Sequence, residues 1–356
     1  MKVTTQPLVS VVTPAYNEEQ YLAECIESVL AQTYQNWNYT IVNNCSTDRT
    51  LDIARSYAAK DPRIRVHDNE EFLKMLANHN LALRQISPES KYCKVVLADD
   101  WIFPECLEKM VAVAEANPSV GVVSSYQLHG RQVRSAGLSY EQNLVSGREV
   151  CRQFLLQRLI LFGTQNSVLY RSDLVRARDP FYIETDICAD FEVCFALLST
   201  TDLGFVHQVL TFSRPRPGSF GTISFDVGAN YGSLLNILFT YGRQCLSDEE
   251  FGHCFDLQLS QYYRFLGRRI WMERDREFWA YHKAALAALG IELRNSRVML
   301  MALKELLFKI PSPTSLREIV ERRFSLKKIR TSQMRSVIPG LGGKLTDDGH
   351  NRKSNS

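Results

Sequence analysis

The chain has 356 residues, of which 45% are hydrophobic and 23% charged, the composition of an ordinary globular protein. That length suits one large domain with an addition, or two domains. The net charge of +3 creates no strong overall field, so we expect no nucleic-acid partner.

Nine scattered cysteines without a C-x-x-C pair indicate a reducing compartment and argue against a cysteine-ligated metal cluster. The first residues, MKVTTQPLVS, contain no apolar signal core. No stretch approaches the roughly 20 apolar residues that span a bilayer. We therefore expect a cytoplasmic protein, and peripheral contact with the inner face of the membrane stays open.

Over the first hundred residues, β-branched apolar runs alternate with helical patterns. Leu22, Ile26 and Leu30, for example, recur on one helical face. Alternation at this spacing predicts right-handed βαβ units in a Rossmann-like, mostly parallel sheet flanked by helices. The four predicted strands are residues 8–13, 38–44, 63–68 and 94–100.

The carboxyl ends of all four predicted strands carry polar residues. They are Tyr16-Asn17-Glu18, Asn43-Asn44, Asp68 and Asp99-Asp100. The carboxyl ends of parallel strands meet at one edge, where ligands of such sheets bind. We therefore expect these groups to converge on one site.

Beyond residue 104 the pattern predicts further helices and strands, then a basic loop, SRPRPGS. After about residue 226 the predicted elements are helical, and Ser247 to Glu250 fits a capping box. The predicted organisation is an α/β domain over 1–226, a helical region over 227–336 and a disordered tail over 337–356.

Asp99 and Asp100 repel each other, so we expect positive charge nearby. Paired carboxylates at a strand end suit Mg²⁺ or Mn²⁺, which completes its oxygen shell with substrate phosphates. The alternative is that one acid caps the helix predicted to begin at Pro104, which accounts for only one of the two.

Five motifs in this order resemble glycosyltransferase family 2, whose members have the GT-A fold. They are VSVVTPAYNEEQYLAECIESVLAQTYQNW, TIVNNCSTDRT, VVLADDW, ADFE and SRPRPGS, and the resemblance covers roughly residues 8–222. It implies an inverting, metal-dependent enzyme that moves a sugar from a nucleoside diphosphate to an acceptor hydroxyl.

The resemblance also implies roles for individual residues. Asp190 matches the catalytic base, and Asp100 the metal ligand. The expected nucleotide-sugar contacts are Pro14, Tyr16 and Glu18 at the nucleoside, Asn43 or Asn44 at the base, Asp68 beside them, Asp99 at the ribose or phosphate, and Arg214 and Arg216 at the diphosphate.

Simpler interpretations remain for several of these residues. Asp190 could cap the helix that follows it, Arg214 and Arg216 could be solvated loop charges, and Tyr16 could pack on the sheet. Asn43-Asn44 replaces the usual acids. An amide still bonds a base edge, so uracil, thymine and guanine all stay open.

The helical C-terminal region lies outside the resemblance. An apolar helix over 297–310 precedes a basic segment rich in Arg and Lys, which either lies on an anionic membrane surface or forms a solvated face. The predicted acceptor is a glycan or lipid-linked molecule in surface polysaccharide synthesis. The alternatives are an inactive nucleotide-sugar-binding scaffold and a sugar nucleotidyltransferase, although the latter needs a glycine-rich loop that TPAYNEEQY lacks.

Overall fold

The computed structural model describes residues 6–216, 224, 226–270 and 275–309. The basic segment after the apolar helix and the predicted tail lie outside these residues. The chain divides into two compact units, each described by itself. The first contains residues up to 219 together with 233–259, and the second contains 220–232 and the residues from 260 onward.

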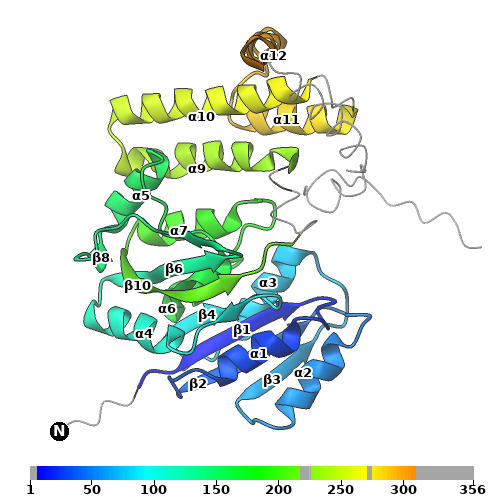
Figure 1. Cartoon of the computed structure of the whole chain (residues 1–356), viewed down its shortest axis with the longest axis vertical. Helices are drawn as coiled ribbons and strands as arrows, with labels where there is room; N and C mark the ends of the chain where they lie inside the picture. Colours follow the sequence, from blue (N-terminus) through cyan, green and yellow to red (C-terminus); the bar gives the residue numbers. More distant parts are fainter. Residues whose placement is uncertain (1–5, 217–223, 225, 271–274, 310–356) are drawn as a thin grey trace, which may run out of the picture. The chain divides into compact units, whose positions relative to one another are not determined.

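The first unit is built on one mixed sheet with the strand order β3-β2-β1-β4-β9-β6-β10-β5, and β7 and β8 pair at its margins (Figure 1). Strands β1 to β4 pair in parallel, as predicted, whereas β9 runs antiparallel between β4 and β6. The strands are β1 Val9–Ala15, β2 Trp37–Asn43, β3 Ile64–Asp68, β4 Tyr92–Val95, β5 Trp101–Ile102, β6 Val120–His129, β7 Gln132–Arg134, β8 Leu144–Val145, β9 Val168–Arg171 and β10 Asp202–Ser213.

Helices cover both faces of this sheet and give it two separate hydrophobic cores. One core contains α1 Leu22–Leu30, α2 Thr50–Ala58 and α4 Cys106–Ala116. The other core contains α3 Met75–Arg84, α5 Gly147–Leu155, α6 Ser172–Arg176 and α7 Ala189–Leu198. The predicted α/β architecture is therefore confirmed.

The local sequence explains the element that leads into the site. All seven residues of β1 are buried, as expected for a parallel strand covered on both faces. Helix α1 begins only at Leu22, because residues 17–21 form a turn first. Asn17 is left-handed, with φ 54°, and its side chain accepts a hydrogen bond from the Thr47 amide. That turn places Glu18 beside the end of β1.

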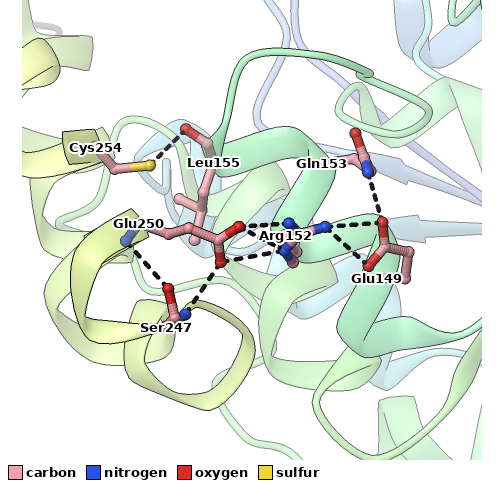
Figure 2. Close-up of polar contacts among 7 residues, drawn as sticks. All are labelled: Glu149, Arg152, Gln153, Leu155, Ser247, Glu250 and Cys254. Carbon is pink, nitrogen blue, oxygen red and sulfur yellow. Dashed lines mark hydrogen bonds and ion pairs between the residues drawn. The ribbon is translucent and has the colours of Figure 1, made fainter. Parts of the chain in front are cut away.

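The capping box at Ser247 is confirmed, and it joins an ion-pair cluster (Figure 2). Ser247 and Glu250 exchange hydrogen bonds at the start of α10 Asp248–Arg269. Both Glu250 oxygens also accept from Arg152 of α5, which bonds Glu149 in its own helix. This cluster fastens α10 to α5 within the first unit.

The second unit is helical in its described residues. It takes in the start of α9 Ala229–Cys245, the end of α10, α11 Arg276–Ala288 and α12 Asn295–Lys309. His282 is buried at its centre, where Nδ1 accepts from the Tyr262 hydroxyl and Nε2 donates to the Val227 carbonyl. The predicted helical C-terminal region is confirmed this far. Across the described helices, none has the length and hydrophobicity needed to cross a membrane.

Candidate functional site

The carboxyl ends of the first strands lie together, as the sequence predicts (Figure 1). The Asn44 amide donates to the Ala15 carbonyl, and the Asn69 amide donates to the Asn43 carbonyl. These bonds continue the ladders of β1, β2 and β3 past their last paired residues. The polar residues after these strands therefore share one edge of the sheet.

Arg214 follows β10 and lies against both aspartates that follow β4. Its amide donates to Asp100 Oδ1 at 2.8 Å, and its Nε donates to the Asp99 carbonyl at 3.1 Å. Its Nη2 bonds Glu24 of α1 at 2.6 Å. The positive charge expected beside Asp99 and Asp100 therefore comes, in part, from this arginine.

Arg216 supplies a second cation at the same place. Its Nε lies 2.8 Å from Asp99 Oδ2, and its two terminal nitrogens bond both oxygens of Glu18, at 3.0 and 2.7 Å. Arg214 and Arg216 are thus not solvated loop charges, because they link the β10 end to the ends of β1 and β4. We call Glu18, Asp99, Asp100, Arg214 and Arg216 the acid–arginine cluster.

Aromatic side chains support this cluster. Trp101 and Phe212 stack with ring centroids 3.5 Å apart across the β5–β10 pair. The Arg214 guanidinium lies 4.4 Å from the Tyr21 ring centroid and 5.2 Å from that of Trp101. Such cation–π contacts hold the guanidinium in place without neutralising its charge.

Asp100 is the least satisfied member of the cluster. It is only 3% exposed, and its Oδ2 has no hydrogen-bond partner among the described residues. Burial, and then the negative charge of Asp99, raise the pKa of this carboxyl well above its usual range. A buried carboxylate oxygen without a partner is costly unless a bound group compensates it.

The donor set fits a divalent cation only in part. Among the described residues, no three acidic, histidine or cysteine side chains gather to form a complete metal site. Asp99 and Asp100 together offer carboxylate oxygens of the kind that Mg²⁺ and Mn²⁺ prefer, and substrate phosphates would supply the rest. Neither acid caps α4, whose N-cap is Glu105 without a side-chain bond, so the capping interpretation is wrong.

The two asparagines at the end of β2 have different environments. Asn43 is buried and donates from Nδ2 to Asp68 Oδ1 at 2.7 Å, while the other Asp68 oxygen pairs with Arg55. Asn44 is also buried, and its side chain bonds the backbone of the loop that follows β3. Pro14 is buried within β1, opposite Val42.

Tyr16 does not pack into the sheet, since its side chain is 44% exposed. Its ring meets that of Phe72, which is itself 58% exposed, with centroids 4.9 Å apart. A hollow of about 430 Å³ lies beside the loop that carries Phe72. Its lining includes Glu70 and Glu71 but no member of the acid–arginine cluster, so we do not assign a diphosphate to it.

Asp190 lies in the first turn of α7, half-buried, and its Oδ1 accepts from the Phe191 amide. The N-cap of this helix is Cys188, so Asp190 does not act as the cap. Burial raises the pKa of Asp190 to about 7, and the charge of Asp186 adds to the rise. In the described part of the chain, no hydrogen bond or ion pair joins Asp190 to the acid–arginine cluster.

Sequence reasoning missed one buried cation near the site. Lys94 lies in β4 and donates from Nζ to the Val168 carbonyl at 3.0 Å and to the Asn166 carbonyl. Asn166 in turn donates to the Phe212 carbonyl, behind the Trp101 stack. Burial lowers the pKa of Lys94 to about 8. The sequence did offer a signal, because Lys94 directly precedes the apolar residues Val95 to Leu97 of a predicted buried strand.

The chain matches a known family over the region that contains most of this site. Residues 10–178, just under half of the chain, match the model described as Glycosyl transferase family 2. One relative, an uncharacterized glycosyltransferase of Haemophilus influenzae, is 38% identical over 120 residues. That match covers 34% of this chain and 36% of the relative, so the chain spans well under half of the relative's length.

Solved structures support the fold. A structure of S. aureus TarS in complex with UDP-GlcNAc has a TM-score of 0.57 and 17% identity, covering 78% of this chain and 79% of that one. The mannosyltransferase PcManGT from Pyrobaculum calidifontis, in complex with GDP-Man and Mn²⁺, has a TM-score of 0.51 and the same identity of 17%. It covers 86% of this chain and 89% of that one. The expected GT-A type fold is confirmed.

Proposed function

We propose that the protein is an inverting glycosyltransferase that transfers a sugar from a nucleoside-diphosphate sugar to an acceptor hydroxyl. The observation that carries this proposal is the acid–arginine cluster at the sheet edge, where Asp100 Oδ2 has no hydrogen-bond partner among the residues that the structure describes. The match of residues 10–178 to the Glycosyl transferase family 2 model supports the reaction class.

Asp100 is the proposed ligand of Mg²⁺ or Mn²⁺, with Asp99 beside it at the ribose or phosphate. The neighbouring fold that holds GDP-Man and Mn²⁺ supports this kind of cation. When bound, the cation supplies positive charge that stabilises the leaving diphosphate. It would also relieve the cost of keeping the Asp100 carboxylate buried.

Arg214 and Arg216 are the proposed diphosphate contacts. A guanidinium matches phosphate oxygens with its planar fork of donors, and it cannot lose its charge. Both side chains are already held at the strand ends, through Tyr21 and Glu18 respectively. Little side-chain entropy would therefore be lost when they meet an anion.

Asp190 is the proposed general base. A sugar hydroxyl must lose its proton as it attacks the anomeric carbon, and a carboxylate within hydrogen-bond reach accepts that proton. A pKa of about 7 leaves a substantial fraction of Asp190 ionised at neutral pH while keeping it a stronger base than an ordinary aspartate. Attack from the face opposite the leaving group, with one base, inverts the anomeric centre.

The nucleoside contacts proposed are Tyr16 and Glu18, with Asn43 and Asp68 at the base side. The Asn43 amide is oriented by Asp68, so its Oδ1 is the acceptor that lacks a partner among the residues described. Buried Pro14 shapes the floor of this region, and buried Asn44 acts through the loop that it holds.

The proposed acceptor is a glycan or a lipid-linked molecule of surface polysaccharide synthesis. This part of the proposal, like a cytoplasmic location with peripheral membrane contact, rests on the family resemblance. The exposed side chains of Met299, Leu300 and Leu303 on α12 are compatible with such contact.

A donor-hydrolysis assay tests the proposal. The full chain is incubated with UDP-, dTDP- and GDP-sugars, with Mn²⁺ or with EDTA, and released nucleoside diphosphate is measured. We expect slow release from one donor class that requires Mn²⁺. Tight donor binding without release, even when acceptors are supplied, would instead identify an inactive scaffold. An absence of binding to every donor would contradict the proposal.

A further inference from the structure

Two exposed aromatic rings stand at the edge of the sheet where the nucleoside is proposed to bind. Tyr16 follows β1, and Phe72 lies in the loop between β3 and α3. Their rings meet edge to face, at an interplanar angle of 62°. Such a pair forms an open corner with two walls, on which a third flat ring can stack against one wall and meet the other with its edge.

The loop that carries Phe72 is held by a dedicated side chain. Asn44 Oδ1 accepts from the Leu73 amide at 2.9 Å, and Asn44 Nδ2 donates to the Leu73 carbonyl at 2.8 Å. The same Oδ1 accepts from Asn69 Nδ2 at 3.0 Å. The side chain of Asn44 therefore hydrogen-bonds both the N–H and the carbonyl of Leu73, the residue next to Phe72.

These hydrogen bonds limit what else the Asn44 side chain can bind. Its amide oxygen already takes two hydrogen bonds, and its amide nitrogen is bonded to a carbonyl. It is also only 2% exposed. The Asn44 side chain therefore has little capacity left to hydrogen-bond a nucleobase. Its effect is to fix the position of Phe72 through the loop.

The position of this corner identifies its ligand class. The backbone N–H of Asn44 donates to the Ala15 carbonyl at the end of β1, directly before Tyr16. The loop bonded by the Asn44 side chain therefore lies beside the end of β1. Ligands of such sheets bind beyond the carboxyl ends of these strands. The flat, weakly polar group that a nucleotide sugar brings there is its base, and bases stack on aromatic side chains.

We propose that Phe72 is the second wall of the nucleobase site, adjoining Tyr16 at the open corner, and that Asn44 is the positioning residue that holds this wall in place. The inference rests on the proposed function, since it presumes a nucleotide donor. It adds a base contact outside the residues of the motifs and assigns Asn44 a role through the loop rather than at the base.

The test compares a ligand with a base and a ligand without one. Affinities of UDP, dTDP and GDP, and of inorganic pyrophosphate, are measured with Mn²⁺ for the full chain and for Phe72→Ala. We expect the tightest of the three nucleotides to bind about 5- to 100-fold more weakly to the variant, the usual effect of losing one stacking ring. Pyrophosphate affinity should not change, and Phe72→Trp should restore nucleotide affinity.

Asn44→Ala should reproduce the effect of Phe72→Ala on the nucleotide, and the double variant should lose little more than either single variant. Unchanged pyrophosphate affinity shows in each case that the variant is folded. Tyr140→Ala is the matched control, because Tyr140 is 82% exposed and lies outside the site.

Two outcomes would overturn the inference. If Phe72→Ala binds the nucleotide as tightly as the unchanged protein does, Phe72 is not a base contact, although the proposed function stands. If the variant loses pyrophosphate and nucleotide affinity equally, Phe72 has only a structural role. By contrast, a failure of the proposed function appears in the unchanged protein, as an absence of binding to all four ligands.

Discussion

Two arginine–carboxylate clusters in the first unit have similar composition, but the pKa values of their glutamates shift in opposite directions. In one, Arg152 bonds Glu250 and Glu149 (Figure 2). In the other, Arg216 bonds Glu18 and Asp99. The bonds from Arg152 and from the Ser247 amide lower the pKa of Glu250 to about 2, whereas burial raises the pKa of Glu18 despite its bonds from Arg216.

The two clusters differ in how deeply their carboxylates are buried and in how many hydrogen bonds those carboxylates accept. Glu250 is near solvent, and its oxygens accept from Arg152 and from the Ser247 amide, so ionisation costs little and gains much. The acid–arginine cluster is less hydrated, and it places two acids beside each other at Asp99 and Asp100. One buried oxygen there has no partner in the described structure. The first cluster stabilises the fold, while the second keeps charge that a ligand can compensate.

The largest expected effect comes from Asp190, whose carboxyl shares the burial-driven rise in pKa. Asp190→Asn should lower the rate of transfer by about 10²- to 10⁴-fold, because it removes the proton acceptor. Donor affinity should stay unchanged. In the unchanged protein, the rate should fall as pH drops below about 7, where Asp190 becomes protonated. Full activity of Asp190→Asn would show that another group is the base.

The same substitution should stabilise the protein at alkaline pH. The folded pKa of Asp190 is raised above the unfolded value, so the folded state loses stability as pH rises from about 4 to about 7. The neutral amide of the variant carries no such cost. We expect Asp190→Asn to increase the free energy of unfolding by about 1–3 kcal/mol at pH 8 and hardly at all at pH 4. Equal effects at both pH values in denaturant titrations would contradict this.

An intermediate effect should separate the two clusters directly. Arg216→Ala should weaken binding of pyrophosphate with Mn²⁺ by roughly 10- to 100-fold, the usual effect of losing a charged hydrogen bond. Arg152→Ala is the matched control, and it should lower the melting temperature without changing pyrophosphate affinity. Calorimetric titration and thermal melts of both variants make the comparison. The contrast between the clusters fails if the two variants lose affinity alike.

The smallest expected effect concerns Glu250. Its pKa is lowered in the folded state, so its contribution to stability is complete above about pH 4 and is lost as pH falls toward 2. Glu250→Gln should lower the melting temperature at pH 7 by no more than about 3 °C, because the pair is near the surface. The difference from the unchanged protein should vanish near pH 2. A difference that persists there would point to the Ser247 cap instead.

The sequence predicted the half of the fold that local pattern controls. Strands β1 to β4 and their polar ends followed from alternation, and Ser247 from the capping box. The insertion of β9 between β4 and β6 did not, because it depends on contacts between distant segments. The turn before α1 was not predicted either, since it depends on the hydrogen bond that the Asn17 side chain accepts from the distant Thr47 amide.

The sequence named candidate site residues, but it did not predict how they are arranged. Asp99 and Asp100 demanded positive charge, yet only the structure shows that Arg214 and Arg216 provide it from residues more than a hundred positions away. Phe72 carried no signal, since a single exposed aromatic in a loop is ordinary. Its proposed role follows from its contact with the Tyr16 ring and from the hydrogen bonds of Asn44 to the neighbouring Leu73.

One titration tests the central claim most directly. The full chain and Asp100→Ala are each titrated with Mn²⁺ and pyrophosphate, and binding heats are recorded. If Asp99 and Asp100 hold the cation, Asp100→Ala should bind Mn²⁺ with pyrophosphate more than about 100-fold more weakly than the unchanged protein. The melting temperature of the variant should stay the same or rise, because a buried charge has been removed. Equal affinities in the two proteins would mean that these acids do not hold the cation.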